Sequence, residues 1–94
     1  MGFATISHWT TTEWNDDLEA IARDKFVPLI LGQGATRVQM IRTGDMSFSV
    51  VTEYADAAAA EAAQAKIAAI RAQATDELPM TMSGSDAGPV FAAG

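Results

Sequence analysis

The stretch ATRVQMIRTGDMSFSVVTEY, residues 35–54, decides the fold of this chain. It holds two runs rich in apolar and β-branched side chains, Ala35 to Arg42 and Met46 to Tyr54, joined by Thr43-Gly44-Asp45. A short polar link that contains glycine between two such runs is typical of a β-hairpin. Side chains alternate across a strand, so the second run directs one set toward a core: Met46, Phe48, Val50, Thr52 and Tyr54.

A helical pattern precedes the hairpin. Over residues 14–29 apolar side chains recur at steps of three and four, which indicates an amphipathic helix. Thr10 and Glu13 have the spacing of a capping box, in which a hydroxyl and a carboxylate each accept a hydrogen bond from a free backbone N–H. Pro28 should kink or break the helix near Val27, because proline removes one hydrogen bond and clashes with the preceding turn.

The remaining segments complete an order of six elements. Phe3 to Trp9 is rich in β-branched and aromatic residues and has no breaker, so it predicts a first strand. Residues 57–74 are mostly alanine, the best helix former, and Asp56 precedes them as an N-cap. Leu78 to Met82 predicts a fourth strand, and the Gly-, Ser- and Ala-rich residues 83–94 predict a loop and a C-terminal tail.

The order β-α-β-β-α-β is the ferredoxin-like arrangement of the α+β class, with a four-stranded antiparallel sheet and two helices on one face. We expect one such domain over residues 1–94. Right-handed crossovers predict that the first and third strands lie side by side and parallel in the sheet centre. A single helix layer leaves the other face bare, and Ile6, Ile41 and Val51 make that face apolar. The bare face therefore predicts a homodimer whose two sheets meet.

Composition excludes several classes of protein. Apolar residues make up 49% of the chain, which excludes a disordered protein, and there is no cysteine for a disulfide or a thiolate metal site. Twelve acidic residues outnumber six scattered basic ones, so we expect neither nucleic acid nor an anionic membrane as partner. No apolar run is long enough to span a bilayer, and the first residues lack the basic region of a signal peptide. The expected location is therefore the cytoplasm.

Four features together resemble one superfamily: the element order, the strand end Ser7-His8-Trp9, the Gly44-Asp45 hairpin, and the Tyr54-Ala55-Asp56 entry into an alanine-rich helix. Over residues 3–82 the chain is similar to the dimeric α/β-barrel superfamily, which includes cofactor-independent monooxygenases of the antibiotic-biosynthesis type and muconolactone isomerases. The resemblance implies a homodimer that builds one barrel from two sheets. It also implies a ligand held between sheet and helices, with no cofactor.

The predicted parallel pair brings chemistry-bearing side chains to one end of the sheet. His8, the one histidine, ends the first strand beside Glu53 and Tyr54; since imidazole titrates near neutral pH, His8 is the candidate catalytic base. Tyr54 and Arg37 are candidate ligand-binding residues, one as a hydroxyl donor and the other as a guanidinium for a carboxylate. Trp9 is the candidate aromatic wall of the pocket.

Each candidate also has a structural role open to it. A histidine at a strand end is often a hydrogen-bonded structural or interface residue, and an aromatic ring there often lies in the core. Arg37 on an edge strand discourages aggregation, and Trp9 equally suits a dimer interface. The acidic group Glu13, Asp16 and Asp17 has no histidine at ligand spacing, so no metal site is expected.

Two functions follow from the sequence. One is a small cofactor-free dimer that binds or transforms a hydrophobic or aromatic metabolite, by oxygenation or isomerisation, with His8 as the base. The other is a non-catalytic dimeric module that binds a ligand or another protein. A deep pocket with His8 pointing inward favours the first function, and His8 in the dimer seam favours the second.

Overall fold

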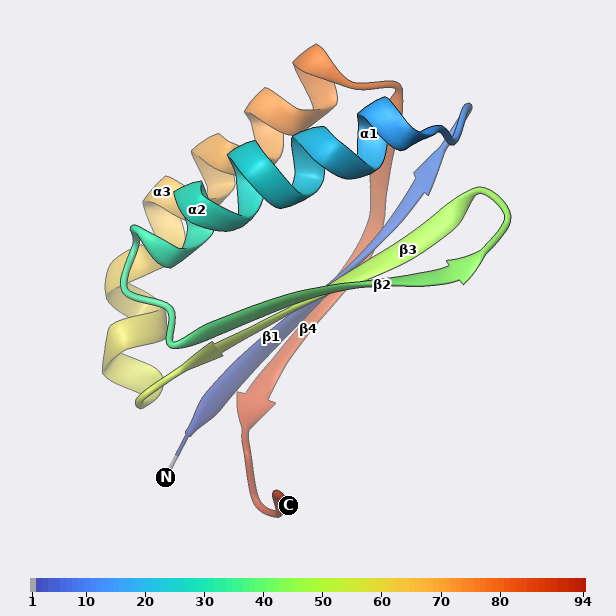
Figure 1. Cartoon of the computed structure of the whole chain (residues 1–94). Coiled ribbons are helices and arrows are strands. Elements are labelled where there is room, and N and C mark those ends of the chain that lie inside the picture. The colour runs from blue at the N-terminus through green and yellow to red at the C-terminus, as the bar shows by residue number, and fades with distance from the viewer. Residues whose placement is uncertain (1) are drawn as a thin grey trace.

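The computed structural model describes residues 2–94, with Met1 outside the described range, and shows an antiparallel sheet of four strands (Figure 1). The elements in chain order are β1 (Phe3–Thr11), α1 (Asp16–Ile21), the π-helical segment η1 (Ala22–Phe26), α2 (Val27–Leu31), β2 (Arg37–Gly44), β3 (Ser47–Tyr54), α3 (Ala57–Glu77) and β4 (Met80–Pro89). The predicted α+β class and βαββαβ order are confirmed, because α1, η1 and α2 follow one another as a single helical stretch.

The strand order is β2-β3-β1-β4, and every neighbouring pair is antiparallel. In the central pair Phe3 lies opposite Tyr54, and Thr10 lies opposite Ser47. The prediction that the first and third strands are parallel is therefore wrong. The helical crossover makes β2 parallel to β1, and the hairpin then turns β3 back into the gap between them. The carboxyl end of β1 thus lies beside the start of β3.

The first helical stretch accommodates Pro28 by widening. The N–H of Val27 donates to the carbonyl of Ala22, five residues back, where an α-helix would bond four back. This wider turn directly precedes Pro28, which has no N–H and whose ring crowds the preceding turn of a regular α-helix. The expected break near Val27 is therefore replaced by a π-helical segment, and the helix continues to Leu31.

The start of this helix also differs from the prediction. Asn15 is the N-cap, and its side-chain oxygen accepts a 2.8 Å hydrogen bond from the N–H of Leu18. Thr10 belongs to β1, which runs on to Thr11, so Thr10 and Glu13 form no capping box. The β1 pairing with β4 competes with the cap for these threonines and keeps them in the sheet.

β4 is longer than its sequence suggests. The loop predicted from Ser83 is wrong as far as Pro89, because this segment pairs with β1 along its whole length. Glycine, serine and aspartate are poor strand formers, but the exposed edge of β1 offers a complete row of backbone partners. A register shift between His8 and Trp9 interrupts the ladder. Beyond the strand, Phe91 is 92% exposed.

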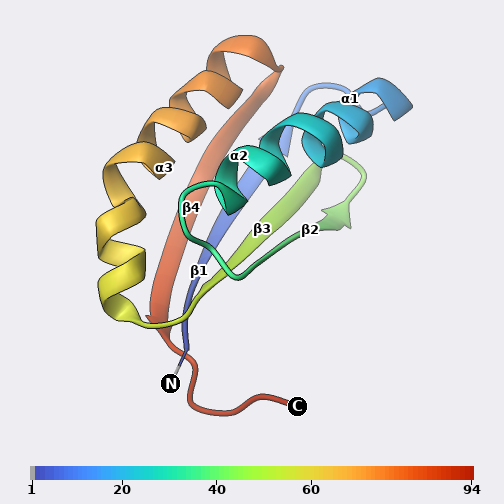
Figure 2. The same cartoon turned by 60° about the vertical axis from the view of Figure 1, so that its left-hand side comes forward.

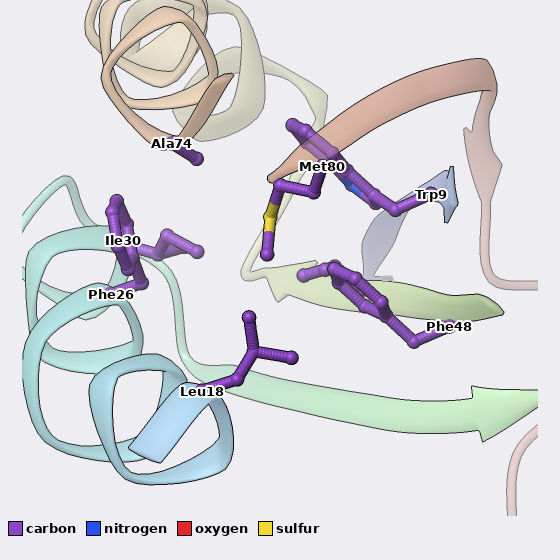
Figure 3. Close-up of a cluster of buried hydrophobic side chains, with 8 residues drawn as sticks. Trp9, Leu18, Phe26, Ile30, Phe48, Ala74 and Met80 are labelled. Atoms are coloured by element: carbon purple, nitrogen blue, oxygen red, sulfur yellow. The ribbon is translucent and has the colours of Figure 1, made fainter. Parts of the chain in front are cut away.

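The core lies between the sheet and the helices, which cover one face of it (Figures 1 and 2). Figure 3 shows side chains from both layers meeting there: Trp9, Leu18, Phe26, Ile30, Phe48, Ala74 and Met80. The rings of Trp9 and Phe48 stack with their centroids 6.1 Å apart. Of the core set predicted on β3, Phe48, Val50, Thr52 and Tyr54 are buried, while Met46 lies in the hairpin turn and is 47% exposed.

The opposite side of the sheet, here called the open face, carries no helix (Figures 1 and 2). Strand alternation and pairing place five residues near its centre: Ile6, His8, Ile41, Ser49 and Val51. Ile41, on the edge strand β2, is 47% exposed. None of the helices in the described residues is long and apolar enough to cross a membrane.

Candidate functional site

Among residues 2–94, adjoining hollows run between the sheet and the helices. The first, here called the inner cavity, has a volume of about 60 Å³. Its lining is apolar apart from Ser7, Thr52 and Arg71, and its largest side chains are Trp9, Phe26, Ile30, Met40, Phe48 and Met80. Ligand pockets span about 300–1,000 Å³, so the inner cavity alone is too small for a metabolite.

The inner cavity adjoins a second hollow of about 350 Å³, here called the outer pocket. The two share four lining residues: Ala22, Met40, Phe48 and Met80. Trp14 and Arg42 form the wall near the hairpin, where the guanidinium carbon of Arg42 lies 4.3 Å from the indole centroid. The indole N–H of Trp14 donates to Glu19 at 2.7 Å. The outer pocket therefore combines an aromatic wall with a fixed cation.

A third hollow, here called the α3 groove, lies on the other side of the inner cavity between α3, β1 and β4 and has a volume of about 480 Å³. Ile67 and Arg71 line both the α3 groove and the inner cavity. Tyr54 lines the α3 groove and is 3% exposed. The three hollows together run through the whole layer between sheet and helices.

The sequence predicted that His8, Trp9, Tyr54 and Arg37 share one end of the sheet, and the structure separates them. Trp9 lines the inner cavity, with its indole N–H donating to the Ser7 hydroxyl at 2.8 Å. Tyr54 lies opposite Phe3, at the far end of β1 from Trp9. The shared end required parallel central strands, so the antiparallel pairing removes it.

His8 lies on the open face, away from the inner cavity. Its Nδ1 shares a 3.0 Å hydrogen bond with the Ser49 hydroxyl, and its Nε2 lies 3.4 Å from an Asp86 carboxylate oxygen. Arg37 is exposed at the start of β2, opposite Glu53, also on the open face. The role of His8 as a base and that of Arg37 as a ligand-binding residue stay predictions.

Arg42 and Arg71 line the hollows, although the sequence did not predict a site role for either. A signal for Arg71 was present, because it follows Ile67 by four residues and therefore shares its helix face. Arg42 gave no such signal, since its position depends on packing between Trp14 and the hairpin.

Arg71 and Glu61 are the charged side chains of the α3 groove, because the carboxylate of Asp86, which also lines it, lies 3.4 Å from His8 on the open face. Arg71 is half-buried and has no carboxylate within ion-pair distance among residues 2–94. Burial raises the pKa of Tyr54 above its ordinary 10.0, and the Arg71 cation offsets part of that rise. Tyr54 therefore keeps its hydroxyl proton at neutral pH. Glu61 and Asp86 also line the α3 groove, and both are exposed.

Comparisons with known proteins show which solved structures share this fold. No protein-family model matches the sequence, and no curated protein matches it. Solved structures match at low identity. SnoaB, a cofactor-independent oxygenase from Streptomyces nogalater, has a TM-score of 0.73 at 16% identity, over 98% of this chain and 95% of that one.

Two further structures give the same result. A protein of unknown function from Nitrosomonas europaea has a TM-score of 0.72 at 20% identity, over 99% of this chain and 92% of that one. A dimeric ferredoxin-like protein from an uncultured marine organism has a TM-score of 0.69 at 14% identity, over 99% of this chain and 97% of that one. The predicted fold is thus confirmed: the chain has the ferredoxin-like fold that these solved structures share.

Proposed function

We propose that this protein binds a small hydrophobic or aromatic metabolite between its sheet and its helices. The observation that carries the proposal is the continuous wall of Trp9, Phe48 and Met40 that joins the inner cavity to the outer pocket. Apolar walls with a few placed polar groups are typical of small-molecule sites. Trp14 adds a second aromatic surface, with its ring edge-on to Phe48 at 5.9 Å.

The proposal includes turnover of that metabolite without a cofactor, by oxygenation or isomerisation. The fold shared with a cofactor-independent oxygenase supports this step. The base would have to act from the cavity side, and His8 of the same chain lies on the other side of the sheet. We therefore place binding in the inner cavity and outer pocket and leave His8 outside them.

A second candidate function is a non-catalytic binding module. The tethering of His8 by Ser49 and Asp86 on the open face favours it, because a histidine bonded within a sheet face has a structural role to perform. Both candidates share the same pocket, and they differ in whether the bound molecule is changed.

Both candidates also include a homodimer formed through the open face. Ile6, Ile41 and Val51 give that face an apolar centre that no helix of the described chain covers. A chain of 94 residues buries a modest share of its surface, so a second copy supplies apolar contact that the monomer lacks. Likeness to a dimeric ferredoxin-like protein supports the same assembly.

The test of the binding site uses N-phenyl-1-naphthylamine, a neutral probe that fluoresces in apolar surroundings. Ala22 lines both the inner cavity and the outer pocket, so Ala22→Phe should fill the passage and weaken probe binding at least about tenfold. Ala62→Phe on the exposed side of α3 is the matched control and should bind as wild type does. Circular dichroism confirms that both variants fold. Absence of wild-type binding, or equal binding by both variants, contradicts the proposal.

A further inference from the structure

The α3 groove contains a polar pair that the proposed function does not use. Tyr54 is 3% exposed as a residue, and its hydroxyl forms no hydrogen bond within residues 2–94. That hydroxyl is open to the groove, because no buried side-chain polar atom in this range lacks a partner. Arg71, which lines the same groove, is half-buried and has no carboxylate partner in that range. A partly buried cation normally has a counter-charge, and Arg71 has none in this range. A hydroxyl donor that lines the same groove and is free of protein partners favours an anionic ligand there.

We propose that the α3 groove is a second binding site, which takes a hydrophobic monocarboxylate. The carboxylate would accept hydrogen bonds from the Arg71 guanidinium and the Tyr54 hydroxyl. The apolar part of the ligand would lie along Phe3, Ile67 and Ala68, which line the same groove. A volume of about 480 Å³ is enough for a two-ring aromatic acid or a medium-chain fatty acid.

Each half of the polar pair has the chemistry that this ligand needs. The Arg71 guanidinium is always charged, and its planar donors match the two oxygens of a carboxylate. The Tyr54 hydroxyl remains a donor at neutral pH, because burial raises its pKa. A hydrogen bond from each side chain would give the carboxylate partners that differ in charge and direction, which fixes its orientation.

The other charges of the groove restrict the ligand to a single negative charge. Glu61 lines the groove and is exposed. Asp86 also lines it, but its carboxylate is 79% exposed and lies 3.4 Å from His8 on the open face. Exposed carboxylates are screened by water and salt, so they repel one negative charge weakly. A phosphate ester carries nearly two charges, which double both the attraction to Arg71 and the repulsion from the carboxylates. Its desolvation cost rises with the square of the charge, so the single cation Arg71 offsets a smaller share of it. A monocarboxylate is therefore favoured over a phosphate ester.

The experiment compares 2-naphthoate with 2-naphthamide, which have almost the same shape and differ in charge, by isothermal titration calorimetry. Wild type should bind 2-naphthoate at least about tenfold more tightly than the amide. Arg71→Gln should remove that preference, and Tyr54→Phe should weaken 2-naphthoate binding by about two- to tenfold. Lys66→Gln, which removes an exposed cation of α3 that lines none of the hollows, is the matched control and should change neither affinity.

Three results would overturn the second site: no binding of 2-naphthoate to wild type, equal affinity for acid and amide, or an unchanged acid affinity in Arg71→Gln. Ala22→Phe separates this proposal from the proposed function, since it should abolish N-phenyl-1-naphthylamine binding and leave 2-naphthoate bound. Loss of 2-naphthoate binding in Ala22→Phe would place the acid in the outer pocket and contradict a separate site.

Tyr54 supplies a readout specific to the site, because it is the only tyrosine of the chain. Bound 2-naphthoate should neutralise Arg71 and raise the pH at which tyrosinate absorbance develops, relative to the amide. An identical titration with acid and amide would contradict contact between the carboxylate and this pair.

Discussion

The two faces of the sheet differ in what covers them: the helices pack on one face and leave the other exposed. On the helix side Trp9 and Phe48 are 4% and 8% exposed, while Ile41 on the open face is 47% exposed. The same alternation along each strand produces both faces, so the difference comes from the helices and not from strand composition. The helix side of the sheet packs into the core, which contains the hollows. The other face is apolar and uncovered, and holds the tethered His8.

The largest expected effect comes from breaking the helix side. Trp9→Ala should lower the free energy of unfolding by about 3–5 kcal/mol, because it removes a buried ring stacked on Phe48. Trp14→Ala should cost about 1–2 kcal/mol, since Trp14 is half-buried and meets Phe48 edge-on. Urea unfolding followed by circular dichroism measures both. Equal losses for the two tryptophans would contradict a core centred on Trp9.

A charged side chain introduced on the open face should dissociate the proposed dimer and leave the fold of each chain intact. Ile41→Asp should weaken the proposed dimer at least about 100-fold, because it buries an unpaired carboxylate in the interface. Light scattering should then change from about twice the chain mass of 9.9 kDa to that mass itself. Ala62→Asp on the exposed side of α3 is the control and should leave the mass unchanged. A wild-type monomer would remove the dimer from the proposed function.

The ionisation of Tyr54 tests the helix side of the sheet at the α3 groove. Its folded-state pKa is raised above the ordinary 10.0, first by burial, so the neutral hydroxyl contributes stability that is fully present below pH 10.0. That stability is lost as pH rises through the folded-state pKa. Tyrosinate absorbance should therefore appear at higher pH in the folded than in the urea-unfolded chain. Arg71→Gln should shift the folded transition higher still, and a downward shift would show that Arg71 does not act on Tyr54.

The smallest expected effect lies on the outer surface of the helices. Lys25 lies 2.7 Å from a carboxylate oxygen of Glu77, and this hydrogen bond lowers the pKa of Glu77 below 4.5. The pair therefore stabilises the fold above pH 4.5, and that contribution is lost as pH falls through the folded-state pKa. Lys25→Met should return the Glu77 pKa toward 4.5, as followed by NMR of its side-chain carboxyl. The effect on unfolding should be slight, because exposed ion pairs are well screened.

Local signals in the sequence predicted the elements whose structure depends on local interactions. The glycine link of the hairpin and the alanine-rich α3 were identified to within a few residues, because turn chemistry and helix propensity act over short distances. The neighbours in the sheet centre were predicted correctly, but their relative direction and the length of β4 depend on distant strands, and both of these were predicted wrongly. Ser83 to Pro89 has the composition of a loop and becomes a strand because β1 presents an edge.

The candidate site was predicted only in part, because it depends on strand alternation, which is local, and on strand direction, which is not. Trp9 and Tyr54 do line hollows, since each faces the helix side of its strand. Their grouping with His8 and Arg37 assumed the wrong strand direction, and His8 falls on the other face by simple alternation. Trp14 packs against the core and also lines the outer pocket beside Arg42.

The π-helical segment couples the number of residues in this helical stretch to the presence of Pro28. A widened turn amounts to one surplus residue in an α-helix, and removing one residue from Ala22 to Phe26 would restore the regular pattern. The regular pattern would bring back the clash at Pro28, so the surplus residue and the proline should be gained or lost together among homologues. Because Ala22 and Phe26 line the inner cavity, such a paired change would also reshape it. The gain or loss of a single residue in this segment could therefore change the shape of the inner cavity while both ends of the helix stay in place.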